Sequence, residues 1–251
     1  MKKWFSFLLA GVTMMLTGCF ETTIEITLHE DGSGTVVNTT DMGKMIGLAR
    51  QMGGGEGLDK AADEAVDTSF SLASTADSIP NLSPEEYQLA REATAGFHMN
   101  MKEEKFNTSV SFPFSSPEGI QARNKLSSKI VNETIKSQMG GADMPGMDEL
   151  GEPSNFDDYF TLEFKKGKIS RTLDKAKYAN AANDTYLNGV KEASAMGLGM
   201  TSTYVINLPR AAKKAEGKGL TLSADKKQVI VKAGIEDFFD NPSQFEFSVE
   251  Y

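Results

Sequence analysis

The chain has 251 residues, of which 39% are hydrophobic and 24% charged, a composition typical of a globular protein rather than a disordered one. Its formal net charge of −9 at pH 7 excludes attraction to nucleic acid or to anionic headgroups by charge, so we expect no nucleic-acid partner. The single cysteine excludes a disulfide within the chain, and the fold must therefore be stabilised by its core.

The N-terminal segment has the pattern of an export signal. Lys2 and Lys3 precede an apolar run from Trp4 to Leu16, and small residues and Cys19 follow it. The run is shorter than the roughly 20 residues that a transmembrane helix needs. An ordinary secretory signal would explain the run but would leave the position of the cysteine to chance. The segment Leu16-Thr17-Gly18-Cys19 instead resembles the bacterial lipobox.

The lipobox resemblance implies cleavage before Cys19 and a diacylglycerol on its sulfur, followed by acylation. We therefore predict that residues 1–18 are a lipoprotein signal peptide and that residues 19–251 are an envelope domain anchored to a membrane through Cys19. In lipoproteins of many bacteria, Asp after the cysteine favours retention at the inner membrane. Phe20 stands there, so we expect the outer membrane if the source is Gram-negative.

The mature sequence opens with a predicted β-hairpin. Residues 22–28 alternate between apolar and polar side chains, residues 30–34 have the composition of a tight turn, and residues 35–40 return as a second strand. His29 and the acidic residues after it resemble a small metal site. However, their spacing differs from that of a calcium loop and no second histidine is near, so we interpret them as a solvated turn and predict no metal site.

The remaining elements follow from periodicity and from helix-start and turn residues. Helices are predicted to begin at Met42, Leu58, Pro84, Pro117, Asp174 and Ile235, and to end near Gly53, Val66, Ala93, Met139, Met196 and Phe239, respectively. Hairpins are predicted over 97–114, 160–173 and 220–231, with further strands over 204–208 and 245–251. The stretch near 140–155 has no apolar period, and we predict a mobile acidic loop there.

Hairpins with one apolar face, separated by amphipathic helices, indicate an α+β fold. We expect an antiparallel curved sheet built from hairpins, with the helices packed on one face.

Two parts of the chain resemble LppM-type bacterial envelope lipoproteins. Cys19 is followed by Ile24 and Ile26 and then by Asp31-Gly32-Ser33-Gly34, and Asn207-Leu208-Pro209 precedes a second hairpin. The resemblance covers about the first forty and last fifty residues. It implies a curved sheet with helices and a pocket for a lipid or other apolar ligand. The methionine-rich middle departs from the family, so the ligand class is not carried over.

Catalytic motifs do not occur in the sequence. There is no Gly-x-Ser-x-Gly elbow, no His-Glu-x-x-His and no phosphate-binding loop. We therefore expect a non-catalytic protein without catalytic residues or cofactors. Two functions remain open: binding a lipid or other apolar ligand at the envelope, or acting as a structural or assembly component that recognises a protein partner.

Phenylalanines on the predicted strands mark the inner face of the sheet. They are Phe97, Phe106, Phe112, Phe160, Phe164, Phe245 and Phe247. Of these, Phe97, Phe112, Phe164 and Phe247 are candidates for facing an apolar ligand. The alternative is that they only pack in the core. An enclosed apolar pocket would favour ligand binding, and a large exposed apolar patch would favour a protein partner.

Overall fold

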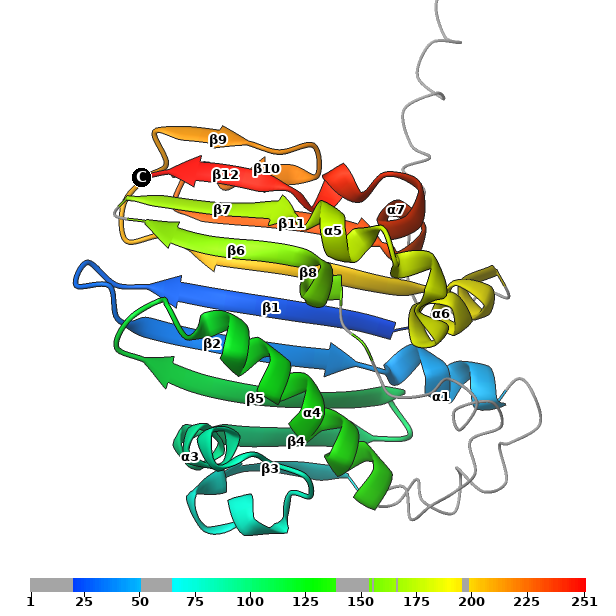
Figure 1. Cartoon of the computed structure of the whole chain (residues 1–251). Helices are drawn as coiled ribbons and strands as arrows, with labels where there is room; N and C mark the ends of the chain where they lie inside the picture. Colours follow the sequence, from blue (N-terminus) through cyan, green and yellow to red (C-terminus); the bar gives the residue numbers. More distant parts are fainter. Residues whose placement is uncertain (1–19, 51–64, 139–153, 155, 166, 196–198) are drawn as a thin grey trace, which may run out of the picture.

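The computed structural model describes residues 20–50, 65–138, 154, 156–165, 167–195 and 199–251 (Figure 1). The predicted signal peptide, Cys19 and nearly all of the predicted mobile loop near 140–155 lie outside these residues. Predictions about them therefore stay predictions.

A large sheet forms one layer of the molecule. Its eight strands in the described residues have the order β10-β11-β8-β1-β2-β5-β4-β3. Their bounds are β1 Phe20–Leu28, β2 Gly34–Asp41, β3 Val66–Ser71, β4 Thr94–Asn100, β5 Lys105–Phe114, β8 Met200–Asn207, β10 Leu220–Leu222 and β11 Gln228–Gly234. Neighbouring strands are antiparallel except β1 and β8, which are parallel with Ile24 opposite Tyr204. The predicted first hairpin is thus confirmed, and it lies in the middle of the sheet.

The turn between β1 and β2 depends on glycine and on a carboxylate. Gly32 has a φ of 87°, which a glycine adopts without steric cost. The Asp31 carboxylate accepts a hydrogen bond from the backbone N–H of Ser33 at 3.0 Å. At Gly34 a side chain would not fit, because a Cβ there would lie 1.9 Å from the Thr27 carbonyl oxygen.

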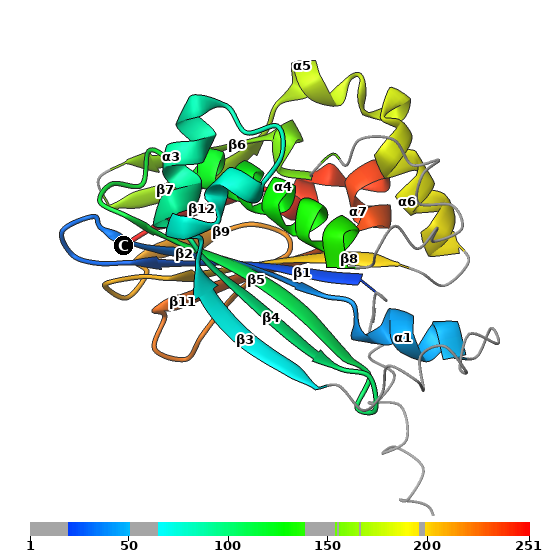
Figure 2. The same cartoon turned by 90° about the horizontal axis from the view of Figure 1, so that it is seen from below.

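A smaller antiparallel sheet covers part of the large one. In the described part of the chain it has the order β6-β7-β12-β9, with bounds Phe160–Lys165, Lys168–Leu173, Phe247–Glu250 and Lys214–Glu216. Figure 2 shows this sheet on the same side of the large sheet as α3 (Pro84–Glu92), α4 (Ile120–Gln138), α6 (Thr185–Ala195) and α7 (Ile235–Asp240). The predicted α+β class and the one-sided helical layer are confirmed. The division of the strands into two sheets was not predicted.

Two predicted helices are wrong in their extent. The helix predicted from Asp174 to Met196 is divided into α5 (Lys175–Tyr178), a 3-10 turn and α6. Asp184 explains the division, because its carboxylate accepts the Leu187 N–H at 2.9 Å and so starts a new helix inside the predicted one. The helix predicted to end at Val66 is also incorrect at that end, since Val66 begins β3.

The main core lies between the large sheet and the layer above it. It contains Ile26 and Phe112 from the large sheet, Ile169 and Phe247 from the small sheet, and Leu126 from α4. A second cluster surrounds Phe238 of α7, and a third contains Met42 at the start of α1 (Gly43–Ala49). Burying these side chains provides the main driving force for folding, since no disulfide is available.

Arg171 of β7 joins the two sheets. Only 1% of its side chain is exposed, and its Nη2 lies 2.7 Å from Asp157 Oδ1. Its Nη1 donates to the Phe245 carbonyl at 3.2 Å. The guanidinium also lies 4.0 Å from the Phe160 ring centroid and 4.6 Å from that of Tyr204, which belongs to the large sheet. The positive charge is therefore balanced by a carboxylate, a carbonyl and aromatic faces.

Tyr204 completes this interlayer cluster. Its hydroxyl donates a hydrogen bond to Asp157 Oδ1, the oxygen that also contacts Arg171. Burial in the interior raises the pKa of Tyr204 well above its ordinary value of 10.0, and the nearby Asp157 carboxylate raises it further. The tyrosine therefore stays a neutral donor at any physiological pH.

We expect Arg171→Met to lower the free energy of unfolding by about 3–5 kcal/mol, because it removes the buried cation that pairs with the largely buried Asp157 carboxylate, which is 13% exposed. Lys168→Met is the matched control on the same strand. The Lys168 side chain is 45% exposed and its Nζ lies 3.9 Å from Glu250 Oε1, so its loss should change stability by less than about 0.5 kcal/mol. Urea denaturation measures both. Equal effects would contradict the role assigned to Arg171.

Candidate ligand groove

An excursion of the chain between β3 and β4 builds a groove on the helical side of the sheet. It consists of the 3-10 helices η2 (Leu72–Ser74) and η3 (Ala76–Ser78), a short loop and α3. Ser71 starts the excursion, because its hydroxyl accepts a hydrogen bond from the Ala73 N–H at 3.2 Å. Leu72 is buried in the main core and fastens the excursion to the sheet.

The start of α3 is fixed by a capping box. The Ser83 hydroxyl accepts from the Glu86 N–H at 3.2 Å, and the Glu86 carboxylate accepts from the Ser83 N–H at 2.8 Å. Pro84 occupies the first turn, where its missing N–H has no cost. The loop before it turns at Asn81, whose φ is 60°. These features give the loop a defined path beside the helix.

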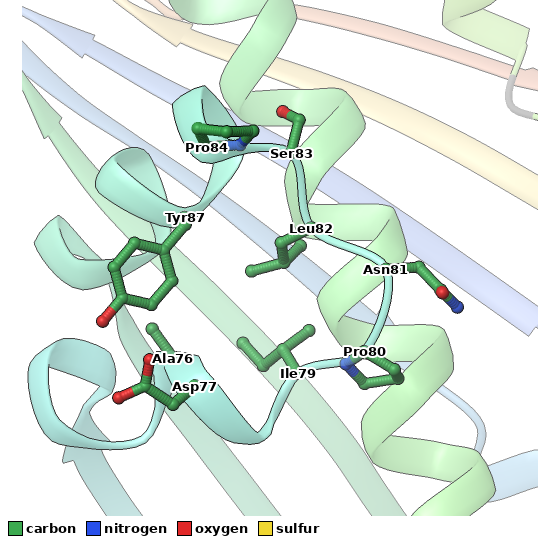
Figure 3. Close-up of a pocket in the computed structure, with 9 residues that line it drawn as sticks. All are labelled: Ala76, Asp77, Ile79, Pro80, Asn81, Leu82, Ser83, Pro84 and Tyr87. Atoms are coloured by element: carbon green, nitrogen blue, oxygen red, sulfur yellow. The ribbon is translucent and has the colours of Figure 1, made fainter.

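The groove has a volume of about 480 Å³ and lies between η3, the loop and α3 (Figure 3). It is lined by Ala76, Asp77, Ile79, Pro80, Asn81, Leu82, Ser83, Pro84 and Tyr87. Ile79, Leu82 and Tyr87 are half-buried and pack against the main core, so they form its apolar wall. Most of the other lining residues are exposed, and the groove is open to solvent.

A polar pair lies at one end of this groove. Asp77 hydrogen-bonds to the Tyr87 side chain, and this bond is the main reason why the pKa of Tyr87 is above its ordinary value of 10.0. Figure 3 shows the two side chains on the same side of the groove. The Arg91 guanidinium lies 5.9 Å from the Tyr87 ring centroid. The groove thus presents an apolar wall and, beside it, a carboxylate with a phenol.

Lys129 of α4 holds the loop and the start of α3 in place on the other side of the groove. Its Nζ lies 3.0 Å from Glu86 Oε2 and also donates to the Asn81 carbonyl. The pKa of Glu86 is below its ordinary value of 4.5, first because the carboxylate accepts the Ser83 N–H and also because of Lys129. The ion pair of Glu86 and Lys129 therefore joins the capping box, the loop and α4.

The four phenylalanines that the sequence suggested lie elsewhere. Phe112 and Phe247 are buried in the main core, and Phe164 packs at its margin. Phe97 packs against Phe106 in the third cluster, with ring centroids 5.5 Å apart. None of them lines the groove, and two have the packing role that the sequence left open. A ligand-facing role for them stays a prediction.

Local sequence patterns did not predict the groove. The available signal was an apolar residue between two prolines, Leu82, followed by Tyr87 in the first turns of a capped helix. That pattern predicts a stiff loop beside an aromatic side chain. The sequence could not show that both lie against the same core.

The face of the large sheet opposite the helices carries rows of hydroxyl groups. Thr23 lies opposite Thr39 on one side and opposite Thr203 on the other. Thr27 lies opposite Thr35 in the same way. These side chains alternate with the buried residues of each strand, and they therefore face away from the covering layer seen in Figure 2. This face is a broad and mainly polar surface.

We expect Glu86→Gln to reduce stability by about 1 kcal/mol at pH 7, because it weakens the capping box. Since the folded-state pKa lies below 4.5, the charged carboxylate stabilises the protein above that pH, and the contribution is lost as the pH falls further. The difference from the wild type should therefore shrink below pH 4.5. Glu85→Gln, at an exposed neighbour, is the control. Urea denaturation at several pH values tests this, and a difference independent of pH would contradict it.

Comparison with known proteins gives one resemblance. No protein-family model and no curated protein sequence matches the chain. Among solved structures, the fold weakly resembles the NMR structure of the folded domain of LppM from Mycobacterium tuberculosis. The two chains are 8% identical, the match covers 93% of this chain and 91% of the other, and the TM-score is 0.36. In the residues that the structure describes, no helix is long and apolar enough to span a membrane.

Proposed function

We propose that the protein is a lipid-anchored, non-catalytic protein of the bacterial envelope that binds a lipid or other apolar ligand in the groove beside α3. The observation that supports this proposal is the groove itself. The groove is open rather than enclosed, and its volume of about 480 Å³ lies within the range of roughly 300–1,000 Å³ that is usual for small-molecule sites. Its half-buried wall of Ile79, Leu82 and Tyr87 offers apolar contact.

The groove best fits an amphipathic ligand. The apolar part of the ligand would lie against Leu82 and Ile79, and a hydrogen-bonding group would lie near Asp77 and Tyr87. A lipid has both parts, and the open side of the groove lets the rest of a long molecule remain outside. His29 and His98 lie outside the groove, in the first turn and on β4, so neither can act as a base on a ligand there.

The proposed anchor adjoins the central strand of the large sheet. Cys19 directly precedes Phe20, where the central strand β1 begins. A lipidated Cys19 would therefore hold the start of the central strand within one residue of the membrane surface. Several acyl chains on one N-terminus make attachment effectively permanent.

The second candidate is an assembly role in an envelope complex. The hydroxyl-rich face of the large sheet favours it, because a broad regular surface is suited to contact with another protein rather than with a small ligand. If the protein has this function, the groove beside α3 would bind no ligand and its residues would only pack against the core.

Photocrosslinking tests the groove. The full-length protein is placed in proteoliposomes that contain a phosphatidylethanolamine with a photoactivatable acyl chain. We expect adducts within residues 76–87, and we expect Leu82→Asp to lower their yield about tenfold because it removes apolar contact. Leu222→Asp, at an exposed leucine of β10, should keep the full yield. Asp77→Asn removes the charge of the side chain and keeps its shape, so it tests the polar end of the groove. Adducts spread evenly over the surface would contradict the proposal.

Replacing Cys19 tests the anchor separately. We expect Cys19→Ser to move the protein from the membrane fraction to the soluble fraction and to abolish incorporation of labelled palmitate, because the thiol is the acceptor. Thr17→Ser keeps the lipobox pattern and should remain labelled. A wild-type protein that is unlabelled and soluble would contradict the anchor.

A further inference from the structure

Each open sheet has two edge strands, and their backbone groups on the outer side have no strand to pair with. In the described residues these strands are β3 and β10 in the large sheet, and β6 and β9 in the small sheet. Proteins usually protect such edges by shortness, charge, proline or a bulge, because an unprotected edge pairs with another strand.

Three of these four edges have such protection. β9 and β10 have three residues each, and β9 has a lysine and a glutamate at its ends. β6 carries Glu163 and Lys165 among its exposed positions. β3 differs, because its six residues include no lysine or proline, and its register with β4 continues without a bulge from Val66 opposite Met99 to Ser71 opposite Thr94. Its one charged side chain, Asp67, lies 2.7 Å from His98 of the neighbouring β4.

Phe70 makes the edge at β3 apolar as well as unprotected. In the part of the chain that the structure describes, the exposed large hydrophobic side chains are Phe70, at 42%, and Leu222, at 37%. Both lie on edge strands of the large sheet, but Leu222 belongs to the short β10. Residues 67 to 71 are all exposed, and Figure 1 shows β3 as the outermost strand on its side.

We propose that β3 pairs in antiparallel fashion with β3 of a second copy of this chain, about a two-fold axis at Thr68. In this register Val66 lies opposite Phe70 of the second copy, and the same pair forms again on the other side of the axis. Asp67 lies opposite Ser69 of the second copy. The two large sheets then become continuous across the interface.

The side chains of β3 are complementary to those of a second copy of β3, and this is why we propose a second copy as the partner of this edge. Val66, Thr68 and Phe70 lie on one face of β3, opposite Met99, Phe97 and Ala95 of β4. In this register the same faces of the two large sheets lie on the same side of the interface. Pairs of an aromatic and a β-branched residue are favourable across strands, and here the two-fold axis forms two of them. The Asp67 carboxylate meets a hydroxyl rather than the other Asp67, so like charges are not opposed.

A closed two-fold pairing also limits the assembly to a dimer. Pairing of β3 with the other edge, β10, would instead continue from copy to copy, and β10 offers only three residues for it. The proposal is independent of the groove function, since it uses none of the residues that line the groove.

Cysteine crosslinking tests the register. Residues directly opposite across the axis have Cβ atoms about 4.5–5.5 Å apart, close to disulfide distance. In full-length protein in detergent, we expect Thr68→Cys to form a disulfide-linked dimer on treatment with copper phenanthroline. Leu222→Cys, on the opposite edge, and the wild type, with Cys19 alone, are the controls. Crosslinking of Thr68→Cys no greater than that of Leu222→Cys would overturn the proposal.

Sedimentation over a concentration series gives a second readout. We expect the wild type to be a dimer, and we expect Phe70→Lys to raise the dissociation constant at least about tenfold, because it removes both apolar pairs and places a charge on the edge. Phe70 is exposed, so the substitution should leave the fold intact. Leu222→Lys should remain dimeric. A monomeric wild type, or a Phe70→Lys variant as dimeric as the wild type, would overturn the proposal.

Discussion

The buried cation Arg171 is the interaction on which the layered structure depends. It comes from the small sheet, contacts a carboxylate at 2.7 Å and lies over the ring of Tyr204 from the large sheet. A charge in this position is costly unless every partner is in place, so it favours one arrangement of the two sheets over others of similar apolar content. The surrounding phenylalanines contribute apolar contact between the layers, and the ion pair favours one relative position of the two sheets. The helices then complete the covering layer around them.

Local patterns in the sequence predicted most strands, because alternation in residues 22–28 or 106–114 reflects direct burial of one strand face. They did not predict β3, where five of six residues are exposed and the alternation is lost. The predicted long helix after Asp174 was wrong since capping by Asp184 acts through side-chain bonds that periodicity does not contain. Division into two sheets depends on contacts between distant strands, and the groove depends on packing of its loop against α4.

One connection of the chain brings the two proposed interaction sites together. β3 leads directly into η2, η3 and α3, so the unprotected edge strand is continuous with the excursion that forms the groove. Leu72 fastens this excursion to the core, and Lys129 fastens it to α4. Because α4 also packs on β2 and β5, the excursion is held by the middle of the large sheet. Both sites are therefore built on a supported part of the fold rather than on a free loop.

The parallel pairing of β1 with β8 has a consequence for biogenesis. Thr27 and Asn207, which are bonded at 3.2 Å, lie 180 residues apart in the chain. Closing so long a loop is slow, and β1 stays without one of its two neighbours until nearly the whole polypeptide is available. A chain exported from its N-terminus would thus cross the membrane before its central sheet is complete. In the anchored function proposed above, attachment at Cys19 would then precede folding, and the domain would acquire its structure while already tethered.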